Sequence, residues 1–480
     1  TATGTITANS LTVTATGGAS TTVVSLGAIT VNAGGTNITV TANNAAAGSN
    51  TGITQTGAIS DVASGSNVSF ISNNKINQTG TITLVANISA APANILYDST
   101  SGTNASSITA GILSVPSGST SAINYIVKTN GAVISVPAIT VPGYILLDNT
   151  CLGCGTRTTT STAATNGAAI AITGALSAGT LAGSTGVTIN AVANGSGVGF
   201  NQAANTITSS AGGVTITSSS QTGTAYYSTG NIVASGQAIT ITTTTTTAAG
   251  IDDTGTISGG AVGLSSTQST ASATATPITA TGLITANSLA VTGTGGASTT
   301  IVSLGAITIN SGGTNINVTA NNAAAGSNTG IAQTGVISDV ASGSNVSFTS
   351  NNKINQTGAI TLVANTSVAP ANIIYDTTTG TNASSITTGT LTVPSGSTSA
   401  INYLVKSNGG IISVPAIAVP GYILLDNTCL GCATKASSSS SGMEVANVNV
   451  ASFRMKFASR MLGVSSPYRL DATFPANCVI

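Results

Sequence analysis

The chain has 480 residues, of which only 4% are charged; ten are basic, ten are acidic, and there is no His and no Trp. Ordinary globular domains carry about 25% charged residues. The lack of a basic patch argues against nucleic acid or an anionic membrane surface as a partner. The lack of His excludes Ser-His-Asp and Cys-His catalytic groups in this sequence. No run of about 20 apolar residues occurs, so no membrane span is predicted.

The composition predicts an all-β chain. Thr, Ser, Asn and Gly are poor or mediocre helix formers. Val, Ile and Thr favour strands, and Gly, Asn and Ser favour turns. Disorder is the alternative for a low-complexity chain, but Val, Ile and Leu recur in every segment and charge is scarce. The chain begins with Thr and its first Met is Met443, so we expect a fragment of a longer protein.

Short phrases recur in the first segment, residues 1–156. The phrases GTIT, GAIT, GAIS and GTIT begin at Gly4, Gly27, Gly57 and Gly80, which is the kind of regular spacing found in repeat architectures. Apolar and polar residues alternate around them, which is the pattern of half-buried strands. Clusters of Gly, Asn and Ser between them supply turns. The spacing fits one coil of three short strands and predicts a first β-solenoid copy.

The middle segment, residues 157–281, is predicted to be a diverged solenoid segment. VASGSNVSF ends at Phe70 and at Phe348, and the similar phrase VANGSGVGF ends at Phe200. Asp252 and Asp253 are the only adjacent acids here. Neighbouring residues on a strand point to opposite faces, so we expect a turn pair and not a catalytic pair.

The third segment, residues 282–434, is a second solenoid copy. Residues 282–434 repeat residues 4–156 without insertion or deletion, and 128 of the 153 aligned positions are identical. Such a repeat indicates a repetitive array. A parallel β-helix, or β-solenoid, is favoured because the aromatic residues that fill a sandwich core are scarce. The alternative is an array of β-sandwich domains. Coils about 4.8 Å apart would give a rod on the order of 100 Å long.

The last segment, residues 435–480, departs from the repeat. It holds all three Met residues, the only Glu and five of the ten basic residues. We expect a disordered, non-repeat tail that does not belong to the fold. The alternative is that FRMKFASRML, residues 453–462, forms a short basic amphipathic helix for a surface or partner contact.

The cysteines form the most specific local motif. CLGC occurs at Cys151 and Cys154 and again at Cys429 and Cys432. Two such pairs make a zinc site only if they meet, and about a dozen coils, on the order of 60 Å, would separate them. Redox catalysis would need a thioredoxin-like βαβ setting. A local disulfide or free thiols remain, and the disulfide is favoured in a secreted protein; Cys478 stays unpaired.

The other candidate groups indicate no catalytic, metal or cofactor site. The acids are scattered, and the repeat that binds calcium in some β-helices is absent. The run YILLDN before each CLGC predicts core packing, with a contact patch between molecules as the alternative. Rows of Thr, such as TVTAT at residues 12–16, raise ice or crystal-surface binding as an alternative, although they do not recur at one interval. The acids considered are Asp61, Asp98, Asp148, Asp252, Asp253, Asp339, Asp376 and Asp426.

These strands, poor in charge and rich in Gly, Thr, Asn and Ala, resemble those of large repetitive bacterial surface and secreted proteins. The GTIT-type phrases and the long repeat in residues 1–434 share this style with filamentous-haemagglutinin-like exoproteins and autotransporter adhesin passengers. The resemblance implies a right-handed parallel β-helix, export to the cell surface, and adhesion or a stalk role. The CxxC pairs are not typical of these proteins.

The sequence therefore predicts a structural and adhesive rod, secreted or held at the cell surface, without an active site or cofactor. Surface glycans or neighbouring copies of the same protein are the expected partners. A carbohydrate-active β-helix enzyme is the first alternative, and it would need acids and bases clustered in one groove. Ice or crystal-surface binding is the second, and it would need a flat face of Thr in register.

Overall fold

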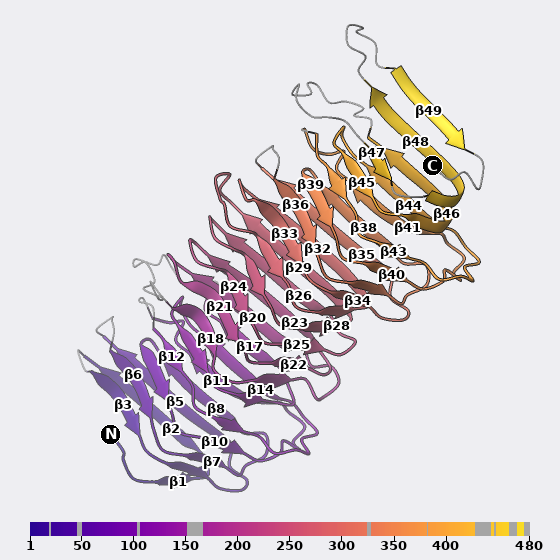
Figure 1. Cartoon of the computed structure of the whole chain (residues 1–480). Helices are drawn as coiled ribbons and strands as arrows, with labels where there is room; N and C mark the ends of the chain where they lie inside the picture. Colours follow the sequence, from indigo (N-terminus) through magenta and orange to yellow (C-terminus); the bar gives the residue numbers. More distant parts are fainter. Residues whose placement is uncertain are drawn as a thin grey trace. The chain divides into compact units, whose positions relative to one another are not determined.

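The computed structural model describes residues 1–18, 21–45, 50–102, 106–150, 167–323, 328–381 and 383–427, and the backbone of 443–445, 448–459 and 468–474. All regular secondary structure in these ranges is strand. The chain divides into two compact units, Thr1–Thr245 and Thr246–Ile480. Each is a parallel β-solenoid, which confirms the fold class (Figure 1). In the described residues there is no helix long and apolar enough to cross a bilayer.

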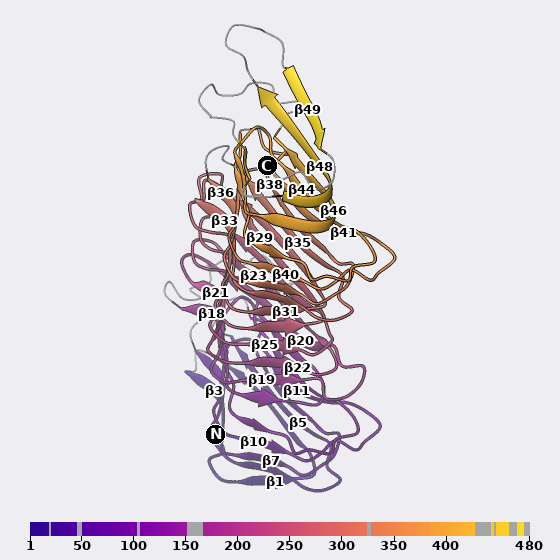
Figure 2. The ribbon, with the colours of Figure 1, turned by 45° about the vertical axis from the view of Figure 1, so that its right-hand side comes forward.

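Each coil of unit 1 consists of three short strands, and strands at the same place in successive coils pair in parallel (Figure 2). We name the three resulting sheets in the order in which a coil visits them. Sheet 1 is divided into a part that ends at β13 and a part that begins at β16. Its strands are β1 (Ile6–Ala8), β4 (Ile29–Val31), β7 (Ile59–Asp61), β10 (Ile82–Leu84), β13 (Leu113–Ser114), β16 (Ile139–Thr140), β19 (Leu176–Ala178), β22 (Ile207–Ser209) and β25 (Ile232–Ala234).

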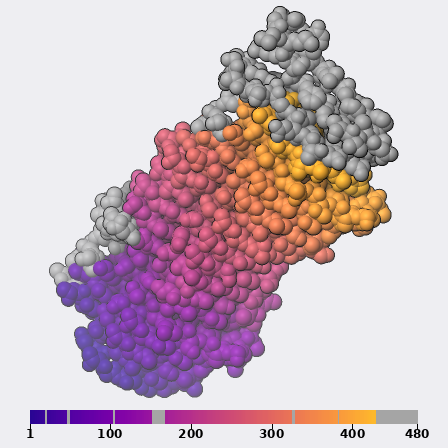
Figure 3. All heavy atoms as spheres, viewed as in Figure 1, coloured from indigo at the N-terminus to yellow at the C-terminus, as the bar shows by residue number. Residues whose placement is uncertain are grey.

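Sheets 2 and 3 complete unit 1. Sheet 2 holds β2 (Leu11–Gly17), β5 (Asn37–Asn44), β8 (Asn67–Ser72), β11 (Ala93–Asp98), β14 (Ile123–Lys128), β17 (Ile145–Asp148), β20 (Gly186–Ala193), β23 (Gly213–Ser220) and β26 (Ile239–Thr245). Sheet 3 holds β3 (Thr22–Leu26), β6 (Thr51–Gln55), β9 (Lys75–Gln78), β12 (Ile108–Thr109), β15 (Ile134–Val136), β18 (Ala168–Ile172), β21 (Val198–Ala203) and β24 (Tyr226–Ser228). Figure 3 shows side chains of this unit, from indigo to magenta, closely packed on the face in view.

Unit 2 repeats the arrangement. Its sheet 1 holds β28 (Ile257–Gly259), β31 (Ile284–Ala286), β34 (Ile307–Ile309), β37 (Ile337–Asp339), β40 (Ile360–Leu362) and β43 (Leu391–Thr392). Its sheet 2 holds β29 (Ala261–Gln268), β32 (Ser288–Gly295), β35 (Asn315–Asn322), β38 (Asn345–Ser350), β41 (Ala371–Asp376), β44 (Ile401–Lys406) and β46 (Ile417–Asp426). Its sheet 3 holds β27 (Ile251–Asp253), β30 (Ile278–Ala280), β33 (Thr300–Leu304), β36 (Thr329–Gln333), β39 (Lys353–Gln356), β42 (Ile386–Thr387) and β45 (Ile412–Val414).

The tail continues the strands of unit 2. β47 (Met443–Val445) pairs with β45 and β48 (Val448–Ser459) with β46, both in parallel, and β49 (Tyr468–Phe474) pairs with β48 in antiparallel fashion. The helix considered for residues 453–462 is therefore wrong for residues 453–459, which belong to β48, and the expectation of disorder is wrong for these three strands. The edge of β46 offers a row of backbone hydrogen-bond partners, and this outweighs the weak local preference for a helix.

The recurring phrases occupy one place in the coil. Ile6 pairs with Ile29, Ile29 with Ile59, and Ile59 with Ile82, so the GTIT and GAIT phrases form one ladder in sheet 1. The sequence intervals differ because the loops between strands differ in length, while the strands keep their register. The prediction of three strands per coil is confirmed.

A column of glycines precedes this ladder at the corner of the coil. A Cβ added at Gly57 would overlap backbone atoms of Gly27 and Ala28, and one at Gly80 would overlap the Gly57 carbonyl oxygen. The same holds for Gly358 against Gly335 in unit 2. Glycine is therefore required here because successive coils approach too closely for any side chain.

The interior is filled by ladders of Ile, Val and Leu, into which short aromatic stacks are inserted. Phe70 stacks on Tyr97 with ring centroids 5.3 Å apart, and Tyr97 is tilted against Tyr125 at 5.8 Å. Unit 2 has the same stack, and the middle segment adds Phe200 on Tyr226 at 5.8 Å. Each fully buried ring or branched aliphatic side chain contributes roughly 1.5–3 kcal/mol. A few aromatic residues therefore suffice for this narrow core.

Phe200 does not occupy the place of Phe70. Phe70 lies on β8 in sheet 2, whereas Phe200 lies on β21 in sheet 3. The middle segment is built of solenoid strands, but the two matching phrases are not in equivalent positions of the coil. The kinship of the middle segment with the two copies stays a prediction.

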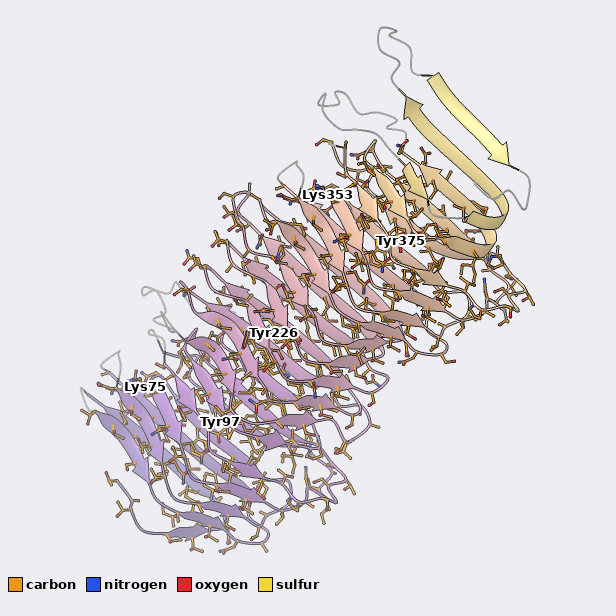
Figure 4. All side chains as sticks on the ribbon, viewed as in Figure 1. Lys75, Tyr97, Tyr226, Lys353 and Tyr375 are labelled. Atoms are coloured by element: carbon orange, nitrogen blue, oxygen red, sulfur yellow. The ribbon has the colours of Figure 1, made fainter. Side chains whose placement is uncertain are left out.

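A buried network of Gln and Tyr ties sheet 3 to sheet 2. The Gln78 side-chain amide donates to Gln55 Oε1 at 3.0 Å, and the Tyr97 hydroxyl donates to Gln78 Oε1 at 2.9 Å. In unit 2, the Gln356 amide donates to Gln333 Oε1 at 2.9 Å, and the hydroxyl of Tyr375, which Figure 4 labels, donates to Gln356 Oε1 at 3.0 Å. Such a network stabilises the fold only because its buried polar groups are paired. Each of these four Gln residues begins a QTG phrase in the sequence, at residues 55–57, 78–80, 333–335 and 356–358.

One difference between the copies leaves a tyrosine hydroxyl without a partner. Tyr403 in unit 2 donates to Thr388 Oγ1 at 2.8 Å. Its counterpart in unit 1 is Tyr125, and Ala110 stands where unit 2 has Thr388. Among the described residues, the buried Tyr125 hydroxyl has no hydrogen-bond partner.

We therefore expect opposite results from the same change in the two copies. Tyr403→Phe removes a satisfied hydrogen bond and should cost about 1 kcal/mol of unfolding free energy. Tyr125→Phe should leave the stability unchanged or raise it, and Ala110→Thr should raise it by about 1 kcal/mol. Urea unfolding of the three variants measures this; equal losses in both Phe variants would contradict the assignment.

Candidate functional site

The outer face of sheet 2 carries charged, apolar, amide and aromatic side chains in neighbouring columns. The side chains of a strand alternate between the core and the surface. On β17, for example, Ile145 and Leu147 are buried, whereas Leu146 and Asp148 are half exposed. Three successive strands, β11, β14 and β17, present similar outward residues. We call their outward residues the sheet 2 face.

The sheet 2 face has a charged column. Asp98 pairs in register with Lys128, and Lys128 with Asp148, so one Lys lies between two Asp residues on adjacent strands. Adjacent strands are about 4.8 Å apart, which places the two Asp backbones about 10 Å apart. The expectation that the acids are scattered is wrong for these two, because register brings together residues that are far apart in sequence.

The two Asp residues also close the corner between sheets 2 and 3. Asp98 Oδ1 accepts hydrogen bonds from the Thr100 backbone N–H at 2.8 Å and the Thr100 hydroxyl at 2.6 Å. Asp148 makes the same two bonds to Thr150. These are turns in which an Asp caps the backbone two residues later. One oxygen of each carboxylate is thus occupied by the fold itself.

The other polar groups of the column face outward. Asp148 Oδ2 accepts from the Asn190 amide at 3.3 Å. Within the described part of the chain, Asp98 Oδ2 and the Lys128 ammonium take part in no hydrogen bond or ion pair. The column therefore offers a free acceptor next to a free donor at the surface.

An apolar column lies beside the charged one. Leu96 pairs with Ile126, and Ile126 with Leu146, all half exposed. In unit 2 the first two residues of this column are Ile374 and Leu404, so Leu and Ile have changed places and the pair still consists of one Leu and one Ile. Volume-conserving exchanges of this kind cost little.

A third column consists of amides and ends in an aromatic ring. The Asn94 amide donates to Asn67 Oδ1 at 3.1 Å, and the Asn124 amide donates to Asn94 Oδ1 at 3.0 Å. Tyr144 follows next, and its unit 2 counterpart Tyr422 is 41% exposed. The run YILLDN thus divides between core and surface, so the core-packing prediction holds only for its inward half.

Unit 2 presents the same face on β41, β44 and β46. Asp376 pairs with Lys406, and Lys406 with Asp426. Asp376 Oδ1 accepts from the Thr378 N–H at 2.8 Å and from its hydroxyl at 2.6 Å. Lys406, like Lys128, makes no hydrogen bond or ion pair with the described residues. The chain therefore carries this face twice.

Two further acids are buried and structural. Asp61, at the end of β7, is 1% exposed, and its carboxylate accepts from the Ala63 N–H at 2.9 Å and from the Ser66 hydroxyl. Asp339 does the same in unit 2. Burial raises the pKa of both carboxyl groups, and these hydrogen bonds oppose the rise.

This raised pKa predicts a pH dependence of stability. A carboxyl whose pKa is higher in the folded than in the unfolded chain stabilises the fold when protonated. Stability should therefore fall as the pH rises from about 4 through the folded pKa. Asp61→Asn with Asp339→Asn keeps the acceptor for the turn N–H and removes the charge. We expect this variant to be more stable than the parent at pH 7 but not below pH 4, as measured by thermal unfolding; equal pH profiles would contradict the prediction.

Asp252 and Asp253 lie on a strand and not in a turn. Both lie on β27, where Asp253 is buried and Asp252 is partly exposed, as alternation requires. The turn expectation is wrong, although Asp253 Oδ1 accepts from the Gly255 N–H at 2.7 Å in the following turn. Asp253 takes the place of Gln in the QTG phrase.

Threonines on sheet 2 do align. Thr215 pairs with Thr240 and Thr217 with Thr242, and all four are exposed. Thr188 adds a third strand next to Thr215. The sequence intervals concealed this register for the same reason as in sheet 1: the loops differ in length.

The remaining sequence predictions fall outside the described residues. Cys151, Cys154, Cys429 and Cys432 all lie there, so the choice between disulfide and free thiols stays a prediction. Within the described residues, no three His, Cys, Asp or Glu side chains gather in a way that would hold a metal ion. Comparison with known proteins finds no matching family model, no matching curated protein and no matching solved structure.

Proposed function

We propose that this chain is a non-catalytic spacer and adhesive segment of a secreted or cell-surface protein, built to add length in whole coils. One observation carries the proposal. Ile6 and Ile284 are equivalent residues of the two repeat copies, and they are the first residues of β1 and β31. Thirty strands, or ten sets of three, separate the two. Duplication in complete coils preserves every register that holds the core together.

Other features support this proposal. The low charge and the repeat style that resembles bacterial surface proteins favour export and a stalk role. The carboxylates of Asp98 and Asp148 each hold a turn, which favours a structural over a catalytic use. Neighbouring copies or surface glycans are the partners we propose, with contacts on the lateral faces.

Surface display tests the spacer role. The chain is placed between a cell-wall anchor and a peptide tag on a cell with a polysaccharide capsule. A version that lacks residues 4–281 has one period fewer, and its new junction reproduces the original sequence because residue 282 follows residue 3. We expect antibody access to the tag to fall when the period is removed. Equal access in both versions would overturn the spacer role.

Ice or crystal-surface binding is a second candidate, favoured by the exposed register of Thr215, Thr217, Thr240 and Thr242. Parallel strands would space these hydroxyls by about 4.8 Å across and about 6.6 Å along the sheet. Inhibition of ice recrystallisation that is lost in Thr217→Lys with Thr242→Lys would support it. If the parent chain does not inhibit ice recrystallisation, ice binding is refuted.

A further inference from the structure

We propose that the sheet 2 face binds an extended, uncharged β-1,4-linked oligosaccharide, once in each unit. This inference rests on the proposed adhesive function and names the ligand class and the site. It concerns the outward residues of β11, β14 and β17, and those of β41, β44 and β46.

The free polar groups match sugar hydroxyls. Asp98 Oδ2 is an acceptor and the Lys128 ammonium a donor; they lie on adjacent strands, and neither is bonded to any described residue. A hydroxyl both donates and accepts, so one hydroxyl, or two neighbouring ones, can satisfy both groups. Hydrogen bonds to charged groups are the stronger kind.

The apolar column matches the other surface of a sugar. Leu96, Ile126 and Leu146 run parallel to the charged column, so a flat pyranose ring can lay its C–H face on them while its edge reaches Asp98 and Lys128. Tyr144 at the end of the amide column adds an aromatic ring with a polar tip, a side chain suited to a wet interface.

Shape and charge select the class of glycan. The face is part of a regular parallel sheet, so an extended and flat chain fits better than a branched or helical one. The column holds two Asp and one Lys, a net charge of −1, and its carboxylates would repel uronic or sialic acids. The strand spacing of about 4.8 Å is comparable with the advance of one pyranose ring in an extended chain, so neighbouring sugars meet equivalent strands.

The test uses cellohexaose as the soluble probe and calorimetry of the whole chain. Lys128→Gln with Lys406→Gln replaces the charged ammonium donor in both units by a shorter, neutral amide. Asp98→Asn with Asp376→Asn keeps Oδ1 as the acceptor for the turn and replaces Oδ2 by a donor. We expect each pair of changes to weaken binding by about tenfold or more, without a change in the melting temperature.

The matched control is Lys75→Gln with Lys353→Gln. These Lys residues begin β9 and β39 on sheet 3, away from the sheet 2 face (Figure 4). The control removes the same charge from each unit and should change binding less than twofold. Equal losses in the control and the sheet 2 variants would overturn the assignment of the site.

Two matching faces on one chain predict avidity. With cellulose oligosaccharides immobilised at high density, Lys128→Gln alone should weaken binding more than it does with soluble cellohexaose, because the loss of one site removes the intramolecular second contact. Tighter binding of sialylated or uronate oligosaccharides than of cellohexaose would overturn the proposed class of glycan.

If cellohexaose does not bind at all, the inferred glycan site is wrong. The spacer role is tested separately, by antibody access to the tag, and would not be affected by this result. Cleavage of cellohexaose that is lost in Lys128→Gln with Lys406→Gln would support the site and overturn its non-catalytic role.

Discussion

Deletion of residues 29–58 should leave a folded chain, whereas deletion of residues 45–58 should not leave the N-terminal coils intact. The first deletion removes β4, β5 and β6, one complete coil, and joins Ala28 to Ile59. The sequence at the new junction is GAIS, which is also the sequence of residues 57–60 at the start of β7 in the parent chain. In the parent chain Ile29 lies between Ile6 and Ile59 and pairs with both. After the deletion, Ile59 takes the place of Ile29 and pairs with Ile6 directly. Repeat proteins tolerate such changes because stability is nearly a sum over neighbouring coils.

The shorter deletion removes β6 alone and leaves β3 without its neighbour. Ile53, which is buried, is lost, and Val24 and Ile76 lose their partner in sheet 3. At roughly 1.5–3 kcal/mol for each apolar side chain, the cost is about 5 kcal/mol or more. Hydrogen exchange of the amides in β3 and β9 measures the difference. Equal protection in the two deletion variants would contradict the coil as the unit of stability.

Gly80→Ala should destabilise unit 1 by about 3 kcal/mol, although it adds only one methyl group. The added Cβ would overlap the Gly57 carbonyl oxygen, which belongs to the backbone of the preceding coil and has no freedom to move without breaking the ladder. Gly358→Ala should do the same in unit 2, where the obstacle is the Gly335 carbonyl.

Gly4→Ala is the matched control for this prediction. Gly4 begins the same GTIT phrase, but a Cβ there meets no atom within 4 Å. We expect its effect to stay within about 0.5 kcal/mol, as for ordinary surface changes. Urea unfolding compares the two variants, and a cost for Gly80→Ala as small as for Gly4→Ala would refute the close approach of coils.

The class of fold follows from sequence because the signals are local. Alternation around Ile29 and Val31 marks a strand, and Gly27 and Gly57 mark the corner before it, so the position of one strand in each coil can be read from the phrases. The tail could not be read in this way. Its basic and apolar residues fit a helix locally, while the strand in its place follows from the open edge of β46, which no local pattern reveals.

The candidate site could not be predicted because it depends on register. Asp98, Lys128 and Asp148 are far apart in the sequence, and loops of different length hide that they lie in one column. The motif Asp-x-Thr at Asp98 and Asp148 was the available signal, since it predicts the turn that ends each strand. The partnership of Gln78 with Tyr97 was hidden for the same reason, as the two lie on different sheets.

Length gives the most direct test of growth by whole coils. A chain made of residues 1–281 followed by residues 4–480 contains one additional period. At its junction Thr281 is followed by Gly4, just as Thr281 is followed by Gly282 in the parent chain. Ten added coils at about 4.8 Å should lengthen the particle by about 48 Å at constant width in electron micrographs. A separate additional bead, or a wider particle of unchanged length, would contradict the account.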